Sequence, residues 1–167
     1  MADDNKGDLI EKVIHVNRVS KVVKGGRRFS FSALVVSGDG NGRVGYGLGK
    51  ANEVSEAVRK ASEAAKKMTK AYSIYNTTIP HVVTGRFCSG KVIMKPAPPG
   101  SGVIAAGAVR AVMEAVGIQD INVKAIGSTN SHNLVKSAIN GLSQLRSFDE
   151  VASLRNKSIE DIKLIDF

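Results

Sequence analysis

Five long cationic side chains cluster within eleven residues of the sequence, around a pair of adjacent glycines. Such side chains reach phosphate groups well, and Gly25 and Gly26 allow the backbone itself to approach a ligand closely. We therefore expect a polyanionic partner whose affinity falls steeply with salt, because each neutralised phosphate releases counterions. An exposed loop that only keeps the protein soluble is the alternative. The five cations are Arg18, Lys21, Lys24, Arg27 and Arg28.

Two extended segments place this cluster at the tip of a hairpin. Residues 9–23 alternate between two faces, and in residues 29–36 the side chains of Phe29 and Phe31 share one face with Ala33 and Val35. The turn signal between the two segments is Lys-Gly-Gly-Arg-Arg. The sequence therefore predicts two antiparallel strands that present the cations at their connection.

A third strand, residues 43–50, follows the hairpin-turn sequence Gly-Asp-Gly-Asn-Gly. Its glycines at 45, 47 and 49 leave one face bare, which lets another element approach the backbone closely. We expect a packed helix on this face, with RNA as the alternative. Residues 52–71 supply that helix, since their apolar side chains recur at helical spacing and Asn52 is a suitable cap.

A second domain is expected from about residue 74, where charge density falls. The first domain then spans 9–73, the second 74–146, and the remainder forms an acidic tail (1–8) and a helical or flexible tail (147–167). In the second domain we predict strands at 78–84, 91–95 and 121–126, a turn at 85–90, and helices at 103–116 and 131–145, with Gly117 and Asn130 or Ser131 as caps. The predicted fold class is α+β, with a β-β-β-α unit followed by a β-β-α-β-α unit.

Two further features of the second domain have competing interpretations. Ser101 and Gly102, before the predicted helix at 103–116, could bind an anion through unpaired backbone N–H groups, and an ordinary capped helix start is an equal alternative. Arg110 interrupts an otherwise small and apolar helix. It could pair locally, or meet a protein partner or RNA.

The sequence contains no complete motif for catalysis or for cofactor binding. Residues 40–45 match G-x-G-x-x-G, but the motif joins two strands, whereas a dinucleotide site needs a strand followed by a helix. Gly49-Lys50 lacks the remainder of a phosphate loop. Cys88 is the single cysteine and is expected to be a small buried hydrophobe. The three histidines lie far apart in the sequence, so we predict no enzyme, no metal and no cofactor.

The overall composition agrees with a polyanion partner. The chain of 167 residues carries a formal charge of +9, and residues 10–70 alone contribute +8. A domain this basic has the electrostatic footprint of a nucleic-acid-binding protein. Its polar, acidic start gives no secretory signal, so a cytoplasmic location is expected. The residues predicted to contact RNA are the five hairpin cations, Gly25, Gly26, Arg43 and Lys50.

At this point the motifs resemble a known family, the bacterial ribosomal protein S5 family of the small subunit. The matching segments are residues 17–21 (NRVSK), 24–27 (KGGR), 38–47 (GDGNGRVGYG), 100–105 (GSGVIA) and 124–130 (KAIGSTN). They occur in order between Leu9 and Leu142, and in combination they are highly specific. The two termini match less well.

The resemblance implies two α/β domains, the first similar to double-stranded-RNA-binding domains. The second would contain a left-handed β-α-β crossover, although right-handed crossovers are the rule. The family binds small-subunit ribosomal RNA, helps the particle assemble, and lies near the path by which messenger RNA enters. With ribosomal protein S4, its chief protein partner in the small subunit, it forms an interface linked to decoding accuracy.

The family pattern also assigns positions in this sequence. Residues 21 and 24–27 fall on the loop that reaches RNA, beside the spectinomycin site of the family. Gly102 and Arg110 fall on the region that faces the protein partner. Arg28 departs from the aliphatic residue of some relatives, which puts its contact in doubt.

We therefore expect a structural protein of the small ribosomal subunit, located in the ribosome in the cytoplasm. The expected partners are small-subunit ribosomal RNA, neighbouring ribosomal proteins and messenger RNA near its path into the particle, without a membrane. A free-standing RNA-binding regulator of the same fold is the first rival. A small enzyme and a protein attached to a membrane surface through the lysine-rich helix are weaker rivals, because no catalytic set is evident and the other face of that helix has the pattern of a core.

Overall fold

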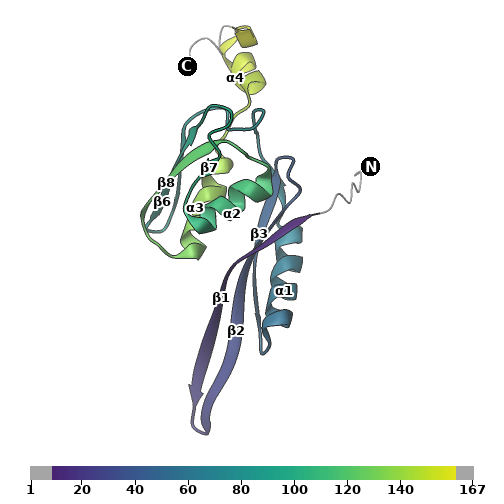
Figure 1. The fold of residues 1–167 in the computed structure, drawn as a ribbon, viewed down its shortest axis with the longest axis vertical. Coiled ribbons are helices and arrows are strands. Elements are labelled where there is room, and N and C mark those ends of the chain that lie inside the picture. Colours follow the sequence, from purple (N-terminus) through teal and green to yellow (C-terminus); the bar gives the residue numbers. More distant parts are fainter. Residues whose placement is uncertain (1–8, 161–167) are drawn as a thin grey trace. The chain divides into compact units, whose positions relative to one another are not determined.

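The structure is a computed structural model in which residues 9–160 are described. The chain divides into two compact units (Figure 1). The first unit comprises the residues up to Ala71 together with Ala111–Gly117, and the second comprises Tyr72–Arg110 and the residues from Ile118 onward. The mixed α+β class with two small α/β units is as the sequence predicts. The predicted acidic tail, residues 1–8, lies outside the described residues.

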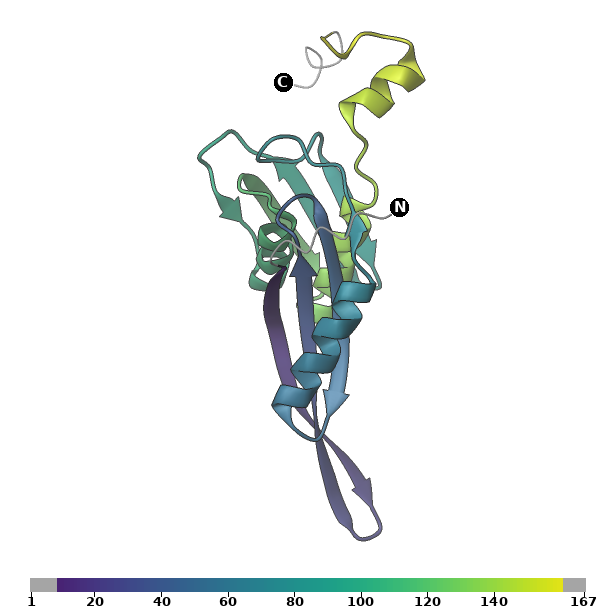
Figure 2. The same cartoon turned by 90° about the vertical axis from the view of Figure 1, so that its right-hand side faces the viewer.

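The first unit is built on a four-stranded antiparallel sheet with α1 on one face (Figure 2). The buried side chains Ala33 and Val35 of the sheet pack against Ala57 and Ala61 of the helix. Phe31 lies beside this core and is partly buried. The strands in sheet order are β1 (Ile10–Val23), β2 (Gly26–Gly38), β3 (Arg43–Ala51) and β4 (Lys70–Ala71), and the helix is α1 (Val54–Lys67).

The bare face of β3 is occupied by α1, as the sequence predicts. A Cβ atom added to Gly45, Gly47 or Gly49 would lie closer than 3.0 Å to a backbone carbonyl oxygen of the helix. Real Cβ atoms essentially never approach that closely, and a backbone atom in the middle of a helix cannot move aside cheaply. The three carbonyls belong to Ala65, Ala61 and Ala57, one helical turn apart.

Three boundaries in the first unit differ from the prediction. The helix begins at Val54 after Glu53, whose extended backbone makes it the cap residue, so the prediction of Asn52 as the cap is wrong. The helix ends by Lys67, because Lys70 and Ala71 pair with β3 as a short fourth strand. The second strand begins at Gly26, since ladder pairing with β1 continues to the turn.

The second unit has a four-stranded sheet with α3 packed against one face. Its strands are β5 (Val83–Phe87), β6 (Gly90–Pro96), β7 (Val103–Ile104) and β8 (Ile121–Gly127), in the spatial order β5-β6-β8-β7. Only the β7–β8 pair is parallel, and α2 (Gly107–Val116) connects these two strands. The chain continues into α3 (Ser131–Leu142) and α4 (Phe148–Arg155). The hand of the β7-α2-β8 crossover stays a prediction.

Four predictions for the second unit are corrected by non-local contacts. Residues 78–82 are not a strand, because Tyr75 and Thr78 exchange backbone hydrogen bonds in a tight turn. Gly85 lies inside β5, where its missing Cβ lets the Ser137 carbonyl of α3 approach. The predicted helix at 103–116 begins only at Gly107, because Val103 pairs with Ile121. The helix predicted to reach residue 145 ends at Leu142, where Ser143 is the C-cap.

The caps of two helices follow the sequence prediction. Gly117 has a positive φ of 96°, and its N–H donates to the Met113 carbonyl at the end of α2. The Asn130 side chain accepts a hydrogen bond from the His132 N–H at the start of α3. The predicted helical tail forms α4 in part, and residues 161–167 of that tail lie outside the described residues.

The glycine contacts of β3 generate a prediction about stability. Replacing Gly47 by Ala should lower the free energy of unfolding by about 1–3 kcal/mol, because the new methyl group overlaps the Ala61 carbonyl. Replacing Gly25 by Ala is the matched control. No atom lies within 4 Å of a Cβ at that position, so a change within about 0.5 kcal/mol is expected. Urea unfolding of both variants tests this, and equal midpoints would contradict the packing.

Candidate nucleic-acid interface

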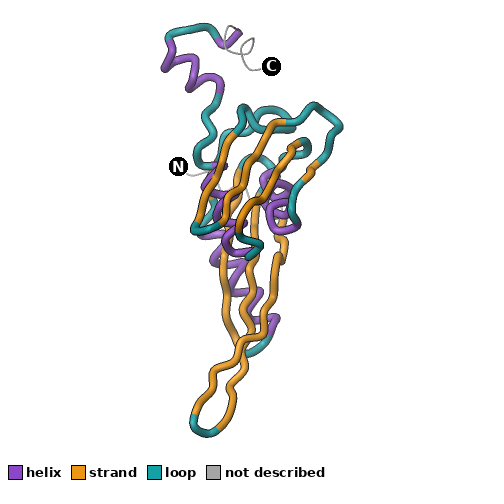
Figure 3. Tube along the Cα trace, turned by 90° about the vertical axis from the view of Figure 1, so that its left-hand side faces the viewer, coloured by secondary structure: helices purple, strands orange, loops and turns teal. Residues whose placement is uncertain are grey.

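The cationic cluster lies on a two-stranded ribbon that extends past the third strand of its sheet. β3 pairs with β2 only from Phe31 to Gly38, whereas β1 and β2 stay paired as far as Val23 and Gly26. The hairpin therefore reaches beyond the sheet without a third strand beside it (Figure 3). Its turn is formed by Lys24 and Gly25.

Positive charge is carried on both faces of this ribbon. Arg27 lies opposite Val22 of β1, and Arg18 lies four residues before Val22 on the same strand. Because side chains alternate along a strand, Arg27 and Arg18 share one face of the ribbon. Lys21 lies opposite Arg28 on the other face. Lys24 adds a fifth exposed cation at the turn itself. A ribbon with this pattern can meet phosphates on two sides at once.

Phe29 positions one of the cations, and the sequence reasoning did not assign it this role. The Arg18 guanidinium carbon lies 3.8 Å from the centroid of the Phe29 ring, in a cation–π contact. The ring supports the flat face of the guanidinium and leaves its N–H edge directed to other partners. The aromatic residue diagonally across from an arginine on the same strand face is the signal that could have found this contact.

In the part of the chain that the structure describes, the hairpin cations have no compensating carboxylate. Residues 12–38 contain no Asp or Glu, and none of the five hairpin cations forms an ion pair within residues 9–160. Lys21 and Arg28 are directly opposite each other, an arrangement that destabilises a strand pair. The isolated hairpin therefore holds concentrated like charge that an external polyanion would relieve.

The cations of α1 are arranged differently, because three of the four have a carboxylate within 4.0 Å. Arg59 donates to Glu63 at 2.6 Å and to Glu56 at 3.2 Å. Lys66 lies 2.8 Å from Glu11 of β1, and this hydrogen bond lowers the pKa of the Glu11 carboxyl. These side chains neutralise charge within the unit, so the helix is a weaker candidate for RNA than the hairpin.

Gly25 and Gly26 leave the hairpin backbone open. No atom of residues 9–160 lies within 4 Å of a Cβ added to either residue. Gly26 has φ +130°, which side chains rarely tolerate, so the turn itself requires this glycine. The φ of Gly25 lies outside the left-handed range, and neither packing nor backbone geometry within the protein requires a glycine there.

The structure separates the two remaining residues predicted to contact RNA. Lys50 lies opposite Ser32, next to the point where the hairpin leaves the sheet. Arg43 lies at the other end of β3, seven residues away, or roughly 23 Å along an extended strand. Lys50 can therefore extend the hairpin surface, while Arg43 belongs to a different part of the unit.

The loop before β3 binds no external phosphate through its own N–H groups. The Asp39 carboxylate accepts hydrogen bonds from the N–H groups of Asn41, at 2.8 Å, and Arg43, at 2.9 Å. The G-x-G-x-x-G sequence of residues 40–45 thus serves a turn between two strands that an internal carboxylate closes, as the sequence analysis predicts.

A second internal carboxylate organises the loop around Gly102. Asp120 Oδ1 accepts from the N–H of Gly100 at 2.9 Å and of Gly102 at 3.0 Å. These bonds, with one involving the Thr77 side chain, lower the pKa of Asp120. Neither interpretation of Ser101 and Gly102 fits the structure. No helix begins there, because α2 starts at Gly107, and the N–H groups of Gly100 and Gly102 already donate to Asp120.

The two predicted partner-facing residues both lie in the second unit. Gly102 has φ +72°, so another residue at this position would be strained. Arg110 lies on α2 and its side chain is exposed. Cys88, expected to be buried, is instead exposed at the β5–β6 turn with φ +50°. That turn places it outside the core.

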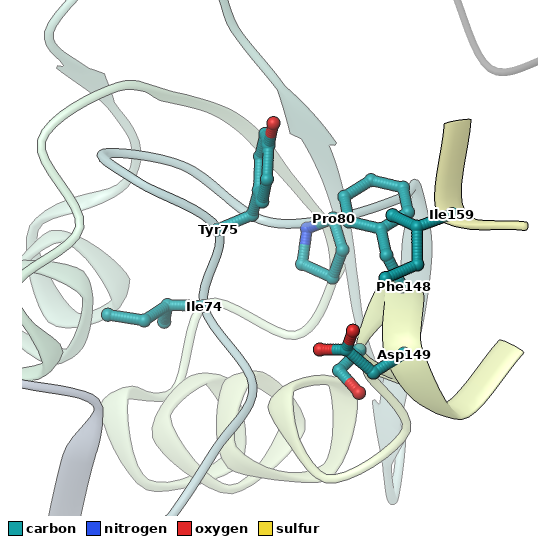
Figure 4. Close-up of a pocket in the computed structure, with 7 residues that line it drawn as sticks. Ile74, Tyr75, Pro80, Phe148, Asp149 and Ile159 are labelled. Carbon is teal, nitrogen blue, oxygen red and sulfur yellow. The ribbon is translucent and has the colours of Figure 1, made fainter. Parts of the chain in front are cut away.

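Two neighbouring hollows lie in the second unit. One, of about 200 Å³, lies between the segment around Ile74 and Tyr75 and helix α4 (Figure 4). Tyr75 meets Phe148 edge to face there, with ring centroids 4.8 Å apart. Among the described residues that line it, Asp149 is the one acidic group. In a neighbouring hollow of about 630 Å³, His81 Nε2 accepts a hydrogen bond from the Arg146 N–H.

Neither a metal-binding cluster nor a membrane-spanning helix is found within residues 9–160. Within these residues no three His, Cys, Asp or Glu side chains come together in a group that could hold a metal ion. Among the same residues, no helix combines the length and the apolar character needed to cross a membrane.

The Asp120 hydrogen bonds generate a prediction about pH. Because the folded-state pKa of Asp120 is lowered, its contribution to stability is complete above the unfolded-state pKa of about 3.9 and is lost as the pH falls through the folded-state pKa. The Asp120→Asn variant should therefore melt below the native protein between pH 5 and pH 8. The difference in Tm should shrink below about pH 4. A difference that stays constant down to pH 2.5 would contradict this assignment.

Comparison with known proteins gives a consistent result over most of the chain. Residues 9–70 match the family model described as ribosomal protein S5, N-terminal domain, and residues 85–155 match ribosomal protein S5, C-terminal domain. A protein of Syntrophobacter fumaroxidans named small ribosomal subunit protein uS5 is 59% identical over 155 residues, 93% of each chain. One of the same name from Lawsonia intracellularis is 56% identical over 152 residues, 91% of this chain and 93% of the relative.

Proposed function

The chain belongs to the ribosomal protein S5 family, and from this premise we propose that its first unit binds small-subunit ribosomal RNA through the β1–β2 hairpin. As a member of the family it is a structural constituent of the small ribosomal subunit and not an enzyme. Its place is in the ribosome, in the cytoplasm.

One observation carries the hairpin proposal: its positive charge is uncompensated. Five cations occupy the turn and both faces of the ribbon, while residues 12–38 supply no carboxylate. Three of the four α1 cations of the same unit are paired with acids, so the difference is local and is not a consequence of net charge alone. A polyanion at the hairpin would remove the repulsion between Lys21 and Arg28 and gain counterion release.

The shape of the hairpin indicates how it would bind. A two-stranded ribbon is narrow enough to enter a wide groove or a junction between helices. Arg18 and Arg27 would then meet phosphates on one side, and Lys21 and Arg28 would meet phosphates on the other. At the turn, Gly25 lets the backbone N–H groups approach the RNA without an intervening side chain. Such contacts read the shape of the RNA more than its sequence.

The salt dependence of binding tests this proposal. Replacing Lys24 and Arg27 by Ala removes two phosphate contacts, so the slope of log K against log salt for binding to small-subunit ribosomal RNA should decrease by about two units. Replacing Lys60 and Lys67 of α1 by Ala removes the same charge from the same unit and should leave the slope nearly unchanged. An unchanged slope in the hairpin variant would exclude the hairpin from the interface.

We also propose that the second unit contacts ribosomal protein S4 near Gly102 and Arg110 and through it affects assembly and decoding accuracy. The support is the family pattern together with the rigid setting of Gly102, which Asp120 and a backbone bond to Ile121 hold in place. A closing movement of the subunit could then keep or break a defined contact. A contact with messenger RNA near its path into the particle belongs to the same proposal.

A misreading reporter tests the role of Arg110. Replacing Arg110 by Ala removes an exposed side chain from α2, so the subunit should still assemble while the frequency of misreading changes by several fold. Replacing the exposed Arg155 of α4 by Ala is the control and should leave accuracy unchanged. Normal accuracy in fully assembled Arg110→Ala ribosomes would count against this interface.

A further inference from the structure

Within the described residues, the sheet of the second unit has one face on which no helix of that unit packs and whose charged side chains are all positive. α3 packs against one side of the sheet (Figure 1), on β5 and β6. On this side the Ser137 carbonyl approaches Gly85. Val92 and Met94 of β6 point to that side and are fully buried. The alternate residues of the strands point to the opposite side, where Ile126 is 45% exposed.

Four cations lie next to one another on this open face. Arg86 of β5 is directly opposite Lys91 of β6. Lys124 of β8 is opposite Ile93, so it lies diagonally between Lys91 and Lys95. Directly opposite residues have Cβ atoms about 5 Å apart, and diagonal neighbours have Cβ atoms about 7–8 Å apart. The cations therefore form a continuous band across three strands, defined here as the sheet band: Arg86, Lys91, Lys124 and Lys95.

We propose that the sheet band is a second RNA-binding surface, separate from the hairpin, and that it takes the phosphate backbone of double-helical RNA. The strands β5, β6, β7 and β8 contain no Asp or Glu. Within residues 9–160, no member of the band forms an ion pair. Arg86 and Lys91 lie directly opposite each other, and the repulsion between their like charges destabilises the sheet. An anion bound over the two side chains would relieve this repulsion.

The side chains of the face favour a duplex over a single strand. Single-stranded RNA is usually held by bases that stack on aromatic rings. Phe87 is the only aromatic residue on the four strands, and it lies under Lys136 of α3, 4.7 Å from that ammonium nitrogen to the ring centroid, on the covered side. The open face instead offers cations with Asn122 and Thr84, which can bond phosphates and 2′-hydroxyl groups.

The position of Lys124 disfavours a protein as the occupant. The centre of a protein–protein interface is depleted in charged residues, and lysine in particular is rare there. Lys124 lies in the middle of the open face, with Lys91 and Lys95 on its two sides. The protein side of a nucleic-acid interface is by contrast much more positively charged than a protein–protein interface.

A set of surface variants in the full chain tests the proposal. Replacing Lys91, Lys95 and Lys124 by Gln removes three charges from the band, and replacing Arg146, Arg155 and Lys157 by Gln removes three from elsewhere in the unit. The probe is an RNA duplex longer than about 16 base pairs, with single-stranded polyuridylate for comparison. The band variant should reduce the salt slope for the duplex by nearly three units, and the control variant should not. Circular dichroism melting confirms that each variant is folded.

The outcomes separate this inference from the hairpin proposal. Combining the band changes with Lys24→Ala and Arg27→Ala should give additive losses, because the two sets lie in different units. If the band variant loses RNA affinity and the hairpin variant does not, the result would support the sheet band and exclude the hairpin from the interface. Equal slopes for the band variant and the native chain would overturn the band, as would a greater loss for polyuridylate than for the duplex. Unchanged RNA binding with loss of the chain from sedimenting subunits would also overturn it, since this identifies a protein occupant.

Discussion

Repulsion between like charges on a narrow ribbon is the constraint on which the rest of the first unit depends. Lys21 and Arg28 are held opposite each other by the strand register, and no carboxylate of the hairpin relieves them. A ribbon of two strands is marginal by itself in water, so it must be held by the sheet at its base. The close fit of α1 against β3 supplies a rigid base. Under our proposal, RNA bound at the hairpin would relieve the repulsion between its cations.

The glycines of the chain serve three separate physical purposes. Those of β3, and Gly85 of β5, permit a helix backbone to approach a strand. Gly100 and Gly102 adopt positive φ in a loop that the Asp120 carboxylate closes. Neither close packing nor a positive φ requires a glycine at position 25. No described atom lies within 4 Å of a Cβ placed there, and its φ lies outside the left-handed range. A close contact with another molecule is the remaining physical reason for a glycine at this position.

Local patterns in the sequence predicted the first unit well. The alternation of β1, the turn at Lys24 and Gly25 and the bare face of β3 depend on neighbouring residues alone, and each is confirmed. The second unit was harder because its elements depend on partners far along the chain. Val103 belongs to a strand only because Ile121 lies beside it, and Gly85 was expected in a turn because α3 could not be seen above it.

The candidate site was found in part by the same reasoning. The cations of the hairpin were evident from spacing, but their division between two faces required the register, and the Arg18–Phe29 contact required coordinates. Arg43 was grouped with them because it is close in sequence, whereas the length of β3 separates it from the hairpin. Asp120 gave no local signal, because the N–H groups that it accepts from belong to a loop about twenty residues earlier.

Cleavage of RNA by a reagent attached to the hairpin turn tests the central claim most directly. The single native cysteine, Cys88, is replaced by Ser, a new cysteine is introduced at Gly25, and an iron chelate that generates hydroxyl radicals is attached there. Small subunits assembled with this chain should show strong cleavage confined to a few adjacent segments of their RNA. Cleavage no stronger than that from a chelate attached at Lys67 of α1 would show that the hairpin turn does not lie against RNA.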